Sequence, residues 1–312
     1  MRRLLILPRQ GEPEDYTADF EAIAAMIRQS DPSIEVIVHW PDEGELRPGP
    51  PMPTMIVALR HLHGPLPVPG RLFGCLPVPK TEQEQAYRKN WIATPRATPF
   101  FWGIDLNPVE WGPFVVIKPL NPALTSHGGA VWFPTALLAT LRREHFTADH
   151  PILRHKFMVQ TFIDTGRHPR HYRVLCLFGT PLYTMRVELK TARPPVTSSL
   201  QAIVSSNIAT NASVPKTRVM VDEPEIAAFA RQVSFALPDV PLQGIDILRE
   251  TKTGKLYALE SNPGGNTWHF SSAFGAVLRD EVGQGREKML AQRDALPLAA
   301  RTLAEATRSY AR

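Results

Sequence analysis

Two acidic side chains take facing positions in a predicted hairpin, GIDILRETKTGKLYALES (residues 244–261). A three-residue turn at 252–254, with glycine at its left-handed position, sets Asp246 opposite Glu260. Asn262 lies two residues further on and so shares their face of the sheet. Facing carboxylates repel each other unless a proton or a cation intervenes, and these oxygens suit Mg²⁺ held jointly with phosphates. The spacing predicts a metal site at these three residues; the alternative is a strand end with solvated acids.

Two arginines take matching positions in a second predicted hairpin, YRVLCLFGTPLYTMRVEL (172–189). With Gly179-Thr180 as a two-residue turn, Arg173 faces Arg186. Like charges placed opposite each other destabilise a sheet unless an anion lies between or over them, and guanidinium groups match phosphate and carboxylate oxygens. The pair predicts an anion site; the alternative is two arginines on a solvated face.

A lysine and a glycine-containing loop complete the set of phosphate-binding groups. Lys118 ends the apolar run FVVIK, where it lies either at the water boundary or in a cleft. The loop beyond it contains Ser126, Gly128 and Gly129, and such small residues let backbone N–H groups approach phosphate oxygens. Lysine, glycine loop, arginines and acids together describe a site for a nucleoside triphosphate.

The elements that must position these groups begin with a β-α-β unit. Residues 4–7 read as a buried strand, and 17–29 as a helix with apolar residues at helical spacing and Thr17 as its N-cap. Residues 34–40 read as a second strand. A unit of this size predicts a parallel pair with a right-handed crossover.

Strands and helices also alternate in the rest of the chain, which predicts a mixed α/β (α+β) fold. Beyond a Pro-rich stretch, the strands predicted outside the two hairpins are 55–59, 114–118 and 156–163. The predicted helices are about 81–92, a helix opened by Pro134, 223–236, and most of 276–311.

Composition narrows the classes of protein. The 312 residues carry 35 Lys plus Arg against 30 Asp plus Glu, a net charge of +5 that allows an anionic ligand without requiring nucleic acid. There is no basic block interleaved with aromatic residues, and no apolar run approaches the ~20 residues of a membrane helix. The two cysteines form neither a disulfide framework nor a zinc set. Pro8 and Arg9 interrupt the apolar start too early for a signal peptide, so we expect a cytoplasmic protein.

The order of these motifs resembles the ATP-grasp superfamily, from about Lys80 to Phe270. It is most similar to the branch of enzymes that add glutamate to the C-terminus of a ribosomal protein, and to related amino-acid ligases. The motifs are VVIKPL with SHGGAV, MVQTFIDTG, HYRVLCLFGTPLYTMRV, SSNIATNAS, GIDIL and YALESNPGG. The resemblance implies two α+β lobes that grip ATP, at 79–155 and 156–312, preceded by a small parallel β-α-β domain at 1–78.

The resemblance also implies roles for single residues. Phosphate contacts would come from Lys118, from Lys80 or Lys89, and from the loop residues Ser126, Gly128 and Gly129. The hinge that reads adenine would be Gln160, Thr161, Phe162 and Ile163, with Asp164 near the ribose. Asp246, Glu260 and Asn262 would bind two Mg²⁺ ions, for which Mn²⁺ could substitute. The transferred phosphoryl group would face Arg173, Arg186 and Asn207. The segment NPGGNTWHFSS departs from the family pattern, and its Asn266, Trp268 and His269 are expected to bind substrate.

The activity implied is an ATP-dependent carboxylate–amine ligase that works through an acyl-phosphate. The expected partners are a small acid and an amine, peptides among them, and a second copy of the chain, with neither nucleic acid nor membrane. Two alternatives stay open: a phosphotransferase that acts on an anionic small molecule, and a nucleotide-binding module without catalysis.

Overall fold

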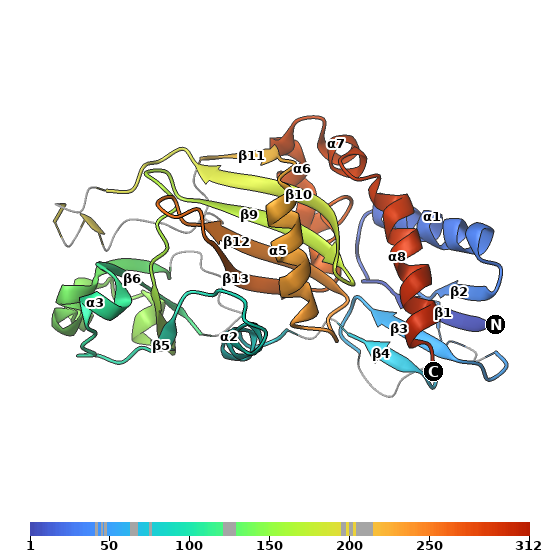
Figure 1. The fold of residues 1–312 in the computed structure, drawn as a ribbon, viewed down its shortest axis with the longest axis horizontal. Coiled ribbons are helices and arrows are strands. Elements are labelled where there is room, and N and C mark those ends of the chain that lie inside the picture. The colour runs from blue at the N-terminus through green and yellow to red at the C-terminus, as the bar shows by residue number, and fades with distance from the viewer. Residues whose placement is uncertain are drawn as a thin grey trace.

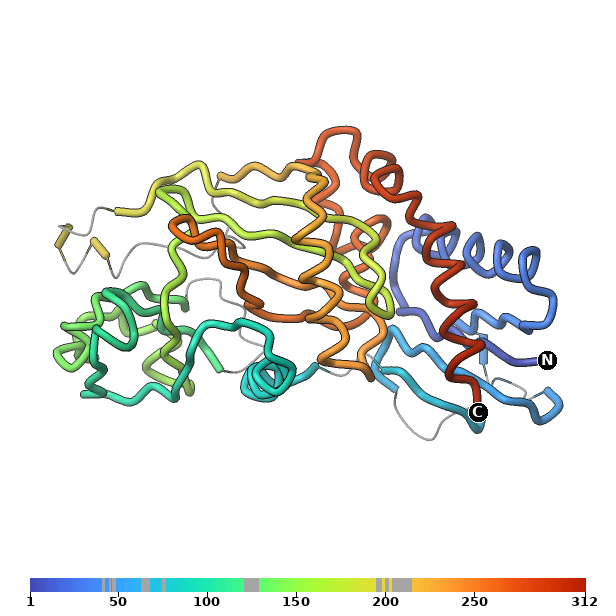
Figure 2. The backbone as a smooth tube through the Cα atoms, in the orientation of Figure 1, coloured from blue at the N-terminus to red at the C-terminus, as the bar shows by residue number. Residues whose placement is uncertain are grey.

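A computed structural model describes residues 1–40, 43–44, 46, 49–62, 68–74, 77–120, 129–194, 198–199, 202–203 and 215–312. The chain forms three sheets that follow one another along an elongated molecule (Figures 1 and 2), and the predicted mixed α/β fold is confirmed. We call them the N-terminal, middle and central sheets. The N-terminal sheet lies within the predicted stretch 1–78, but the middle sheet includes a strand at 157–161, beyond the predicted boundary at residue 155. The division into domains stays a prediction.

The N-terminal sheet is parallel, with strand order β2-β1-β3-β4, so the predicted β-α-β unit is confirmed. Its elements are β1 (Arg2–Leu7), α1 (Glu14–Ser30), β2 (Ile34–Val38), β3 (Thr54–Ala58) and β4 (Arg71–Phe73). Helix α1 buries the predicted face through Phe20, Ile23 and Ile27. Thr17 is not the N-cap: the helix begins at Glu14, because Pro13 precedes it in an extended conformation and acidic residues suit its first turn.

The middle sheet has strand order β5-β8-β6-β7 and is antiparallel. Its strands are β5 (Ala97–Pro99), β6 (Phe114–Pro119), β7 (Val131–Pro134) and β8 (Phe157–Thr161), and the short helix α3 (Pro108–Trp111) contacts β6. Helix α2 (Lys80–Lys89), which precedes these strands, packs against the central sheet. The helix predicted to begin at Pro134 is wrong. Pro134 instead ends a strand paired with β6, and short 3₁₀ turns follow it: η1 (Thr135–Thr140), η2 (Arg143–His145) and η3 (Pro151–Leu153).

The central sheet is antiparallel, with strand order β11-β10-β9-β12-β13. Its strands are β9 (Arg170–Leu177), β10 (Thr180–Leu189), β11 (Lys216–Met220), β12 (Leu242–Arg249) and β13 (Leu256–Pro263). Helix α5 (Pro224–Phe235) packs on one face, as Figure 1 shows, against Tyr172, Val174 and Cys176. The chain beyond β13 contains η4 (Gly265–Thr267), η5 (Ala273–Gly275), α6 (Ala276–Val282), α7 (Gly285–Ala291) and α8 (Ala295–Tyr310).

One hydrophobic core joins the N-terminal sheet to the other face of the central sheet. Leu175, Leu177 and Met185 of the central sheet share it with α1 and with the inner face of α8. Helix α8 lies beside α1 and crosses β1 (Figure 1). A helix near residue 300 therefore packs against the sheet that begins at residue 2. The N–H of Thr54 donates to the carbonyl of Arg312 at 3.0 Å.

The hairpin of β9 and β10 differs from its predicted register. Phe178 and Gly179 form the two-residue turn, both with positive φ (44° and 79°), so the turn begins one residue earlier than predicted. The earlier turn shifts the partner of each β9 residue by two positions, and an irregularity between Pro181 and Tyr183 restores one of them. The net slip of one residue reverses the face on which a side chain lies.

The predicted pairing of the two arginines is therefore wrong. Arg173 pairs with Met185, and Arg186 pairs with Tyr172 on the other face of the sheet. Arg186 thus lies on the side covered by α5, and the two guanidinium groups do not oppose each other.

The hairpin of β12 and β13 confirms the pairing of the two acids. Asp246 lies opposite Glu260, and Gly244 lies opposite Asn262. Near the turn Arg249 pairs with Leu256, one residue out of the predicted register, and a bulge after Asp246 restores it.

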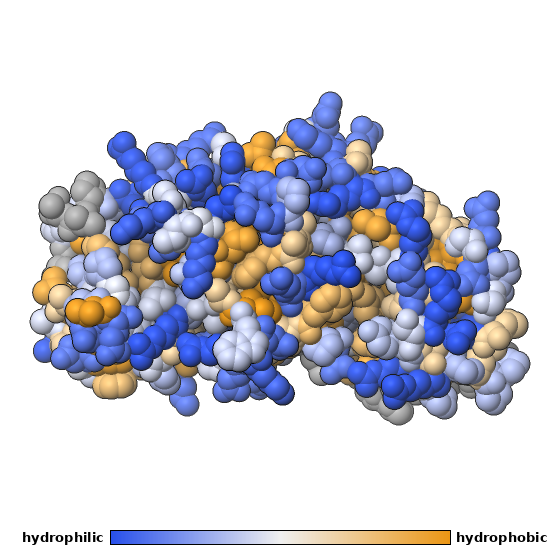
Figure 3. Space-filling view, in the orientation of Figure 1, coloured by the Kyte–Doolittle hydropathy of each residue, from blue (hydrophilic) through white to orange (hydrophobic). Residues whose placement is uncertain are grey.

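The surface is mostly hydrophilic on the face shown in Figure 3, with apolar residues in scattered patches. Within the part of the chain that the structure describes, none of the helices is both long and apolar enough to cross a bilayer.

Two glycine substitutions separate backbone strain from a steric clash. Gly179 and Gly254 both have positive φ, but a Cβ at Gly179 would lie 2.6 Å from the Phe235 ring, whereas nothing lies within 4 Å at Gly254. We expect Gly254→Ala to lower the free energy of unfolding by about 1–2 kcal/mol and Gly179→Ala by about 2–4 kcal/mol, since overpacking is added. Urea denaturation measures both. Equal losses would mean that the turn moves away from α5 without cost.

Candidate functional site

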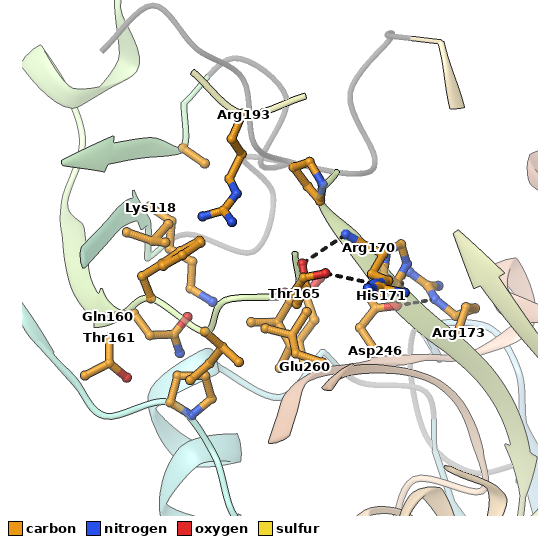
Figure 4. A pocket seen from close by; sticks show the side chains of 18 residues that line it. Lys118, Gln160, Thr161, Thr165, Arg170, His171, Arg173, Arg193, Asp246 and Glu260 are labelled. Atoms are coloured by element: carbon orange, nitrogen blue, oxygen red, sulfur yellow. Dashed lines mark hydrogen bonds and ion pairs between the residues drawn. The ribbon is translucent and has the colours of Figure 1, made fainter. Parts of the chain in front are cut away.

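A cleft lies between the middle and central sheets, with an empty volume, open solvent included, of about 940 Å³. Figure 4 shows Lys118, Gln160 and Thr161 on one side, with Glu260, Asp246, His171 and Arg173 on the other. The lining residues are Pro95, Val116, Lys118, Ala130, Gln160, Thr161, Phe162, Ile163, Thr165, Pro169, Arg170, His171, Arg173, Arg193, Asp246, Leu248, Leu259 and Glu260.

Asp246 is a buried carboxylate surrounded by donors. Arg173 binds it in a bidentate arrangement, Nε to Oδ1 at 2.5 Å and Nη2 to Oδ2 at 2.8 Å. The Nε2 atom of His171 lies 3.4 Å from Oδ1, and the amide of Asn262 donates to Oδ2 at 3.4 Å. Burial alone would raise the pKa of Asp246, but the charges of Arg173 and His171 outweigh it and hold the pKa below its ordinary value.

Glu260 has a separate cation. Lys80, at the start of α2, places Nζ 3.5 Å from Oε2 of Glu260. Lys89 lies exposed at the other end of this helix. Of the two lysines that the sequence left open, Lys80 is therefore the one beside the acids.

Helix α2 also supports the backbone between the acids and Asn262. The side chain of Gln83 accepts from the N–H of Ser261 at 2.8 Å and donates to its carbonyl at 3.0 Å. These are the two bonds that a neighbouring strand would make. Tyr87 donates to the Ser261 hydroxyl at 3.0 Å. The edge strand β13 is thus held in place with Glu260 and Asn262 on one face.

Lys118 is a buried ammonium, 6% exposed, on β6. Burial and the nearby charge of Lys80 lower its pKa to about 8, against the opposing influence of Glu260, Glu84 and Asp246. A lysine in this state is poorly compensated, and a bound anion would stabilise its charged form.

The hinge residues line the cleft as predicted, but some of their backbone donors are already used. The N–H of Thr161 donates to the backbone carbonyl of Arg96 at 2.8 Å, and the N–H of Phe162 donates to the backbone carbonyl of Phe114 at 3.3 Å. A ligand in this cleft would therefore have to bind other groups of this segment. Ile163 is buried and completes the apolar wall.

Arg193 is a lining residue that the sequence did not indicate. Its guanidinium lies over the ring of Phe162, 4.9 Å from the centroid, and donates to Asp164 at 2.5 Å. Asp164 is not among the lining residues. A single arginine in a polar segment carries no pattern from which its position could have been predicted.

The three residues predicted to bind substrate lie in different environments. Asn266 is exposed, whereas Trp268 is 1% exposed and donates from Nε1 to Asp19 of α1 at 2.9 Å. His269 is buried as well, with Nδ1 2.6 Å from the hydroxyl of Tyr183. Burial, with the charge of Arg173, lowers the pKa of His269 to about 3. Trp268 therefore packs in the core instead of lining the cleft, and His269 is a neutral imidazole in the ligand-free protein.

The remaining predicted residues do not join the cleft within the described chain. Arg186 lies on the opposite sheet face, and Gly129 packs against Pro119, where a Cβ would lie 3.1 Å from the proline ring. Ser126, Gly128 and Asn207 lie outside the described residues.

No protein-family model and no curated protein matches this chain. Similar solved structures include a D-alanine–D-alanine ligase from Bacillus anthracis, at 14% identity over 98% of this chain and 99% of that one, with a TM-score of 0.46. The ATP-grasp ligase PsnB, complexed with a phosphomimetic variant of a minimal precursor, Mg and ADP, is 13% identical over 97% of this chain and 97% of that one, with a TM-score of 0.49. The macrocyclase MdnC, bound to precursor peptide MdnA from Microcystis aeruginosa MRC, is 12% identical over 99% of this chain and 100% of that one, with a TM-score of 0.48. All three TM-scores are below 0.5.

The bidentate ion pair predicts a large effect of removing Arg173. Arg173→Met leaves Asp246 buried without its main cation, so we expect the free energy of unfolding to fall by about 3–5 kcal/mol. Arg186→Met, in the same hairpin but on the other face, should cost less than about 1 kcal/mol. Urea denaturation tests both, and adding Asp246→Asn to Arg173→Met should recover much of the loss. Equal effects of the two arginine variants would contradict the observed register.

Removing the charge of Lys118 should stabilise the ligand-free protein. A pKa of about 8 instead of 10.5 in the folded state disfavours folding by up to about 3 kcal/mol below pH 8. This penalty shrinks as the pH rises towards 10.5, because the unfolded chain then also loses the proton. Lys118→Met should therefore raise the melting temperature at pH 7 and have less effect at pH 10. A lower melting temperature at pH 7 would show that the ammonium is already well paired.

Proposed function

We propose that this protein is an ATP-dependent carboxylate–amine ligase of the ATP-grasp type. The observation that carries the proposal is the convergence, in one cleft between two sheets, of Lys118, the hinge and the facing pair Asp246–Glu260. Lys80 and Asn262 lie beside these acids, Lys80 at Glu260 and Asn262 at Asp246. An apolar wall suits a base, and the lysines beside the acids suit phosphates with their cations.

The acids fit Mg²⁺ by the chemistry of their donors. Two carboxylates and a carboxamide are hard oxygen ligands on one sheet face, and the guanidinium of Arg173 now contributes the positive charge that the buried Asp246 needs. Bound there, Mg²⁺ would neutralise the developing charge on the phosphates. The proposal includes the binding of two Mg²⁺ ions and the replacement of Mg²⁺ by Mn²⁺. Asp246, Glu260 and Asn262 would hold the metal, and Arg173 would turn towards the transferred phosphoryl group.

The reaction needs positioning and charge neutralisation instead of a protein nucleophile. A substrate carboxylate oxygen attacks the γ-phosphorus of ATP, and the bond to ADP breaks. The substrate amine then attacks the acyl carbon, and the phosphate leaves and can take the proton of the amine. His269 is unsuited as the base because burial keeps its pKa near 3, and His171 faces Asp246.

The proposal divides the chain into a preceding domain at 1–78, a small lobe at 79–155 and a large lobe at 156–312, with the strand β8 (Phe157–Thr161) joining the sheet of the small lobe. In this proposal the preceding domain and the central sheet enclose the second substrate. The proposal also includes a second copy of the chain, phosphate contacts from Ser126 and Gly128, and a role for Asn207 beside the transferred phosphoryl group.

Changing Glu260 to glutamine tests the function. Glu260→Gln should fold normally, because the side chain keeps its size and Gln83 still holds the strand. Phosphate release from ATP, measured with Mg²⁺ and an amino-acid panel, should fall at least about 100-fold. Binding of Mn²⁺, measured by electron paramagnetic resonance, should weaken as well.

Glu250→Gln, an acid in the turn of the same hairpin that does not line the cleft, is the matched control and should keep both phosphate release and Mn²⁺ binding. Full activity and normal Mn²⁺ binding in Glu260→Gln would contradict the metal assignment. Product analysis of the wild-type reaction distinguishes the alternative: a ligase joins two substrates, and a phosphotransferase yields one phosphorylated product.

A further inference from the structure

Arg193 lines the cleft beside the hinge and is held in a fixed orientation. Its Nη2 donates to Oδ1 of Asp164 at 2.5 Å and to the carbonyl of Gly166 at 2.6 Å, and its Nε donates to the same carbonyl at 3.1 Å. The guanidinium also lies 4.9 Å from the ring centroid of Phe162 and 5.8 Å from that of Trp132. These bonds and ring contacts leave the side chain little freedom, so the guanidinium is a rigid part of the cleft wall.

The Nη1 atom of Arg193 keeps its N–H donors unused. The bonds to Asp164 and Gly166 come from Nη2 and Nε, and among the described residues none accepts from Nη1. In Figure 4 the guanidinium points from the rim into the space that Lys118 and Thr165 border. A donor that is already fixed in place loses little entropy when it binds an acceptor, so Nη1 is suited to contact a ligand.

Apolar side chains from both sheets line the same cleft. Val116 of β6 and Ala130 belong to the side of the middle sheet, and Leu248 of β12 and Leu259 of β13 belong to the central sheet. Apolar walls suit the two faces of a flat aromatic ring, and a few fixed polar groups then set its orientation. A base between these walls would present a polar edge to Arg193.

The cations that suit phosphates form a separate group. Lys80 lies beside Glu260, and both influence the pKa of the buried Lys118, which Lys80 lowers and Glu260 raises. Arg193 is instead bound to the end of the hinge, over Phe162. The contacts of Arg193 thus place it with the hinge, whereas the two lysines lie with the acid of the metal site.

We propose that Arg193 is a specificity-determining residue for the nucleotide, because its Nη1 donates to an unprotonated ring nitrogen at the edge of a purine. A guanidinium group can only donate, so it favours a base with an acceptor at that edge over one with an N–H or a C–H there. Asp164 then acts through Arg193 as a positioning residue, although it does not itself line the cleft. The inference rests on the proposed function for the presence of a nucleotide.

The test is calorimetric titration of the full-length protein, in the presence of Mg²⁺, with ADP and with its 1-deaza, 3-deaza and 7-deaza analogues. Each analogue has a C–H in place of one ring nitrogen. Wild type should bind one of them at least about tenfold more weakly than ADP. Arg193→Met keeps an apolar contact with Phe162 but lacks the donors. This variant should bind ADP at least about tenfold more weakly than wild type does, and the same analogue should lose no further affinity.

Arg96→Met is the matched control and should discriminate as wild type does. Arg96 also lies over an aromatic ring, 4.6 Å from the centroid of Trp111, and donates to Glu110 at 3.1 Å, but it does not line the cleft. Asp164→Asn should reduce the discrimination between ADP and the analogue without removing it. Unchanged discrimination in Asp164→Asn would contradict its role as a positioning residue.

Equal binding of ADP and all three analogues by wild type would overturn the proposal, and so would an equal loss for the analogue in wild type and in Arg193→Met. Adenosine, which has no phosphates, should also bind more weakly to Arg193→Met. Equal binding of adenosine by the two proteins would mean that Arg193 contacts phosphate instead of the base. Circular dichroism establishes folding, and Arg193→Leu serves as the test variant if Arg193→Met does not fold.

Steady-state assays distinguish this contact from the function itself. If no substrate in the panel releases phosphate from ATP while the analogues still discriminate through Arg193, the proposed ligase fails and the base contact stands. If phosphate is released and Arg193→Met leaves the KM for ATP unchanged, the ligase stands and the base contact fails. If both hold, Arg193→Met should raise the KM for ATP and leave the KM for the acid unchanged.

Discussion

The ion pair between Arg173 and Asp246 is the interaction on which the site depends. It places two buried charges on one face of the central sheet, and each would be costly alone. Around it the other groups come in compensating pairs: Lys80 lies beside Glu260, and Arg193 donates to Asp164. Lys118 is the exception, since its pKa is lowered to about 8. The ligand-free cleft is thus electrostatically balanced except at the position where phosphate would enter.

The same face of the central sheet serves two purposes along its length. Towards one end of β9, Leu175 and Leu177 pack into the core shared with the N-terminal sheet. Towards the other end, His171 and Arg173 face the cleft. The core therefore anchors the strands a few residues from the charged groups, and it keeps those groups on a rigid support. Asp19 of α1, which accepts from Trp268 and Ser271, ties the segment beyond β13 to the same core.

The sequence predicted the pairing of the two acids correctly but the pairing of Arg173 with Arg186 wrongly, for a physical reason. Turn chemistry predicted both hairpins, yet Phe178 takes a left-handed conformation that its residue type disfavours, and its ring packs on Phe73. Tertiary packing thus moved one turn, and the arginines with it. In the other hairpin a bulge offset a shift of the same size, so Asp246 and Glu260 still meet. Local pattern cannot reveal a bulge or a neighbouring ring. The parallel β-α-β unit was predictable because it depends on periodicity alone.

The position of α8 couples the synthesis of the chain to its folding. The apolar face of α1 is covered by α8, some 280 residues later in the sequence as the bounds of the two helices show. During translation the first sheet therefore emerges long before the helix that shields it. Contacts of such long sequence separation form slowly, because the loop entropy must be overcome first. Until α8 docks, the apolar surface of the N-terminal unit is open to aggregation and to chaperones. This surface is covered only after all the residues that line the cleft have been synthesised.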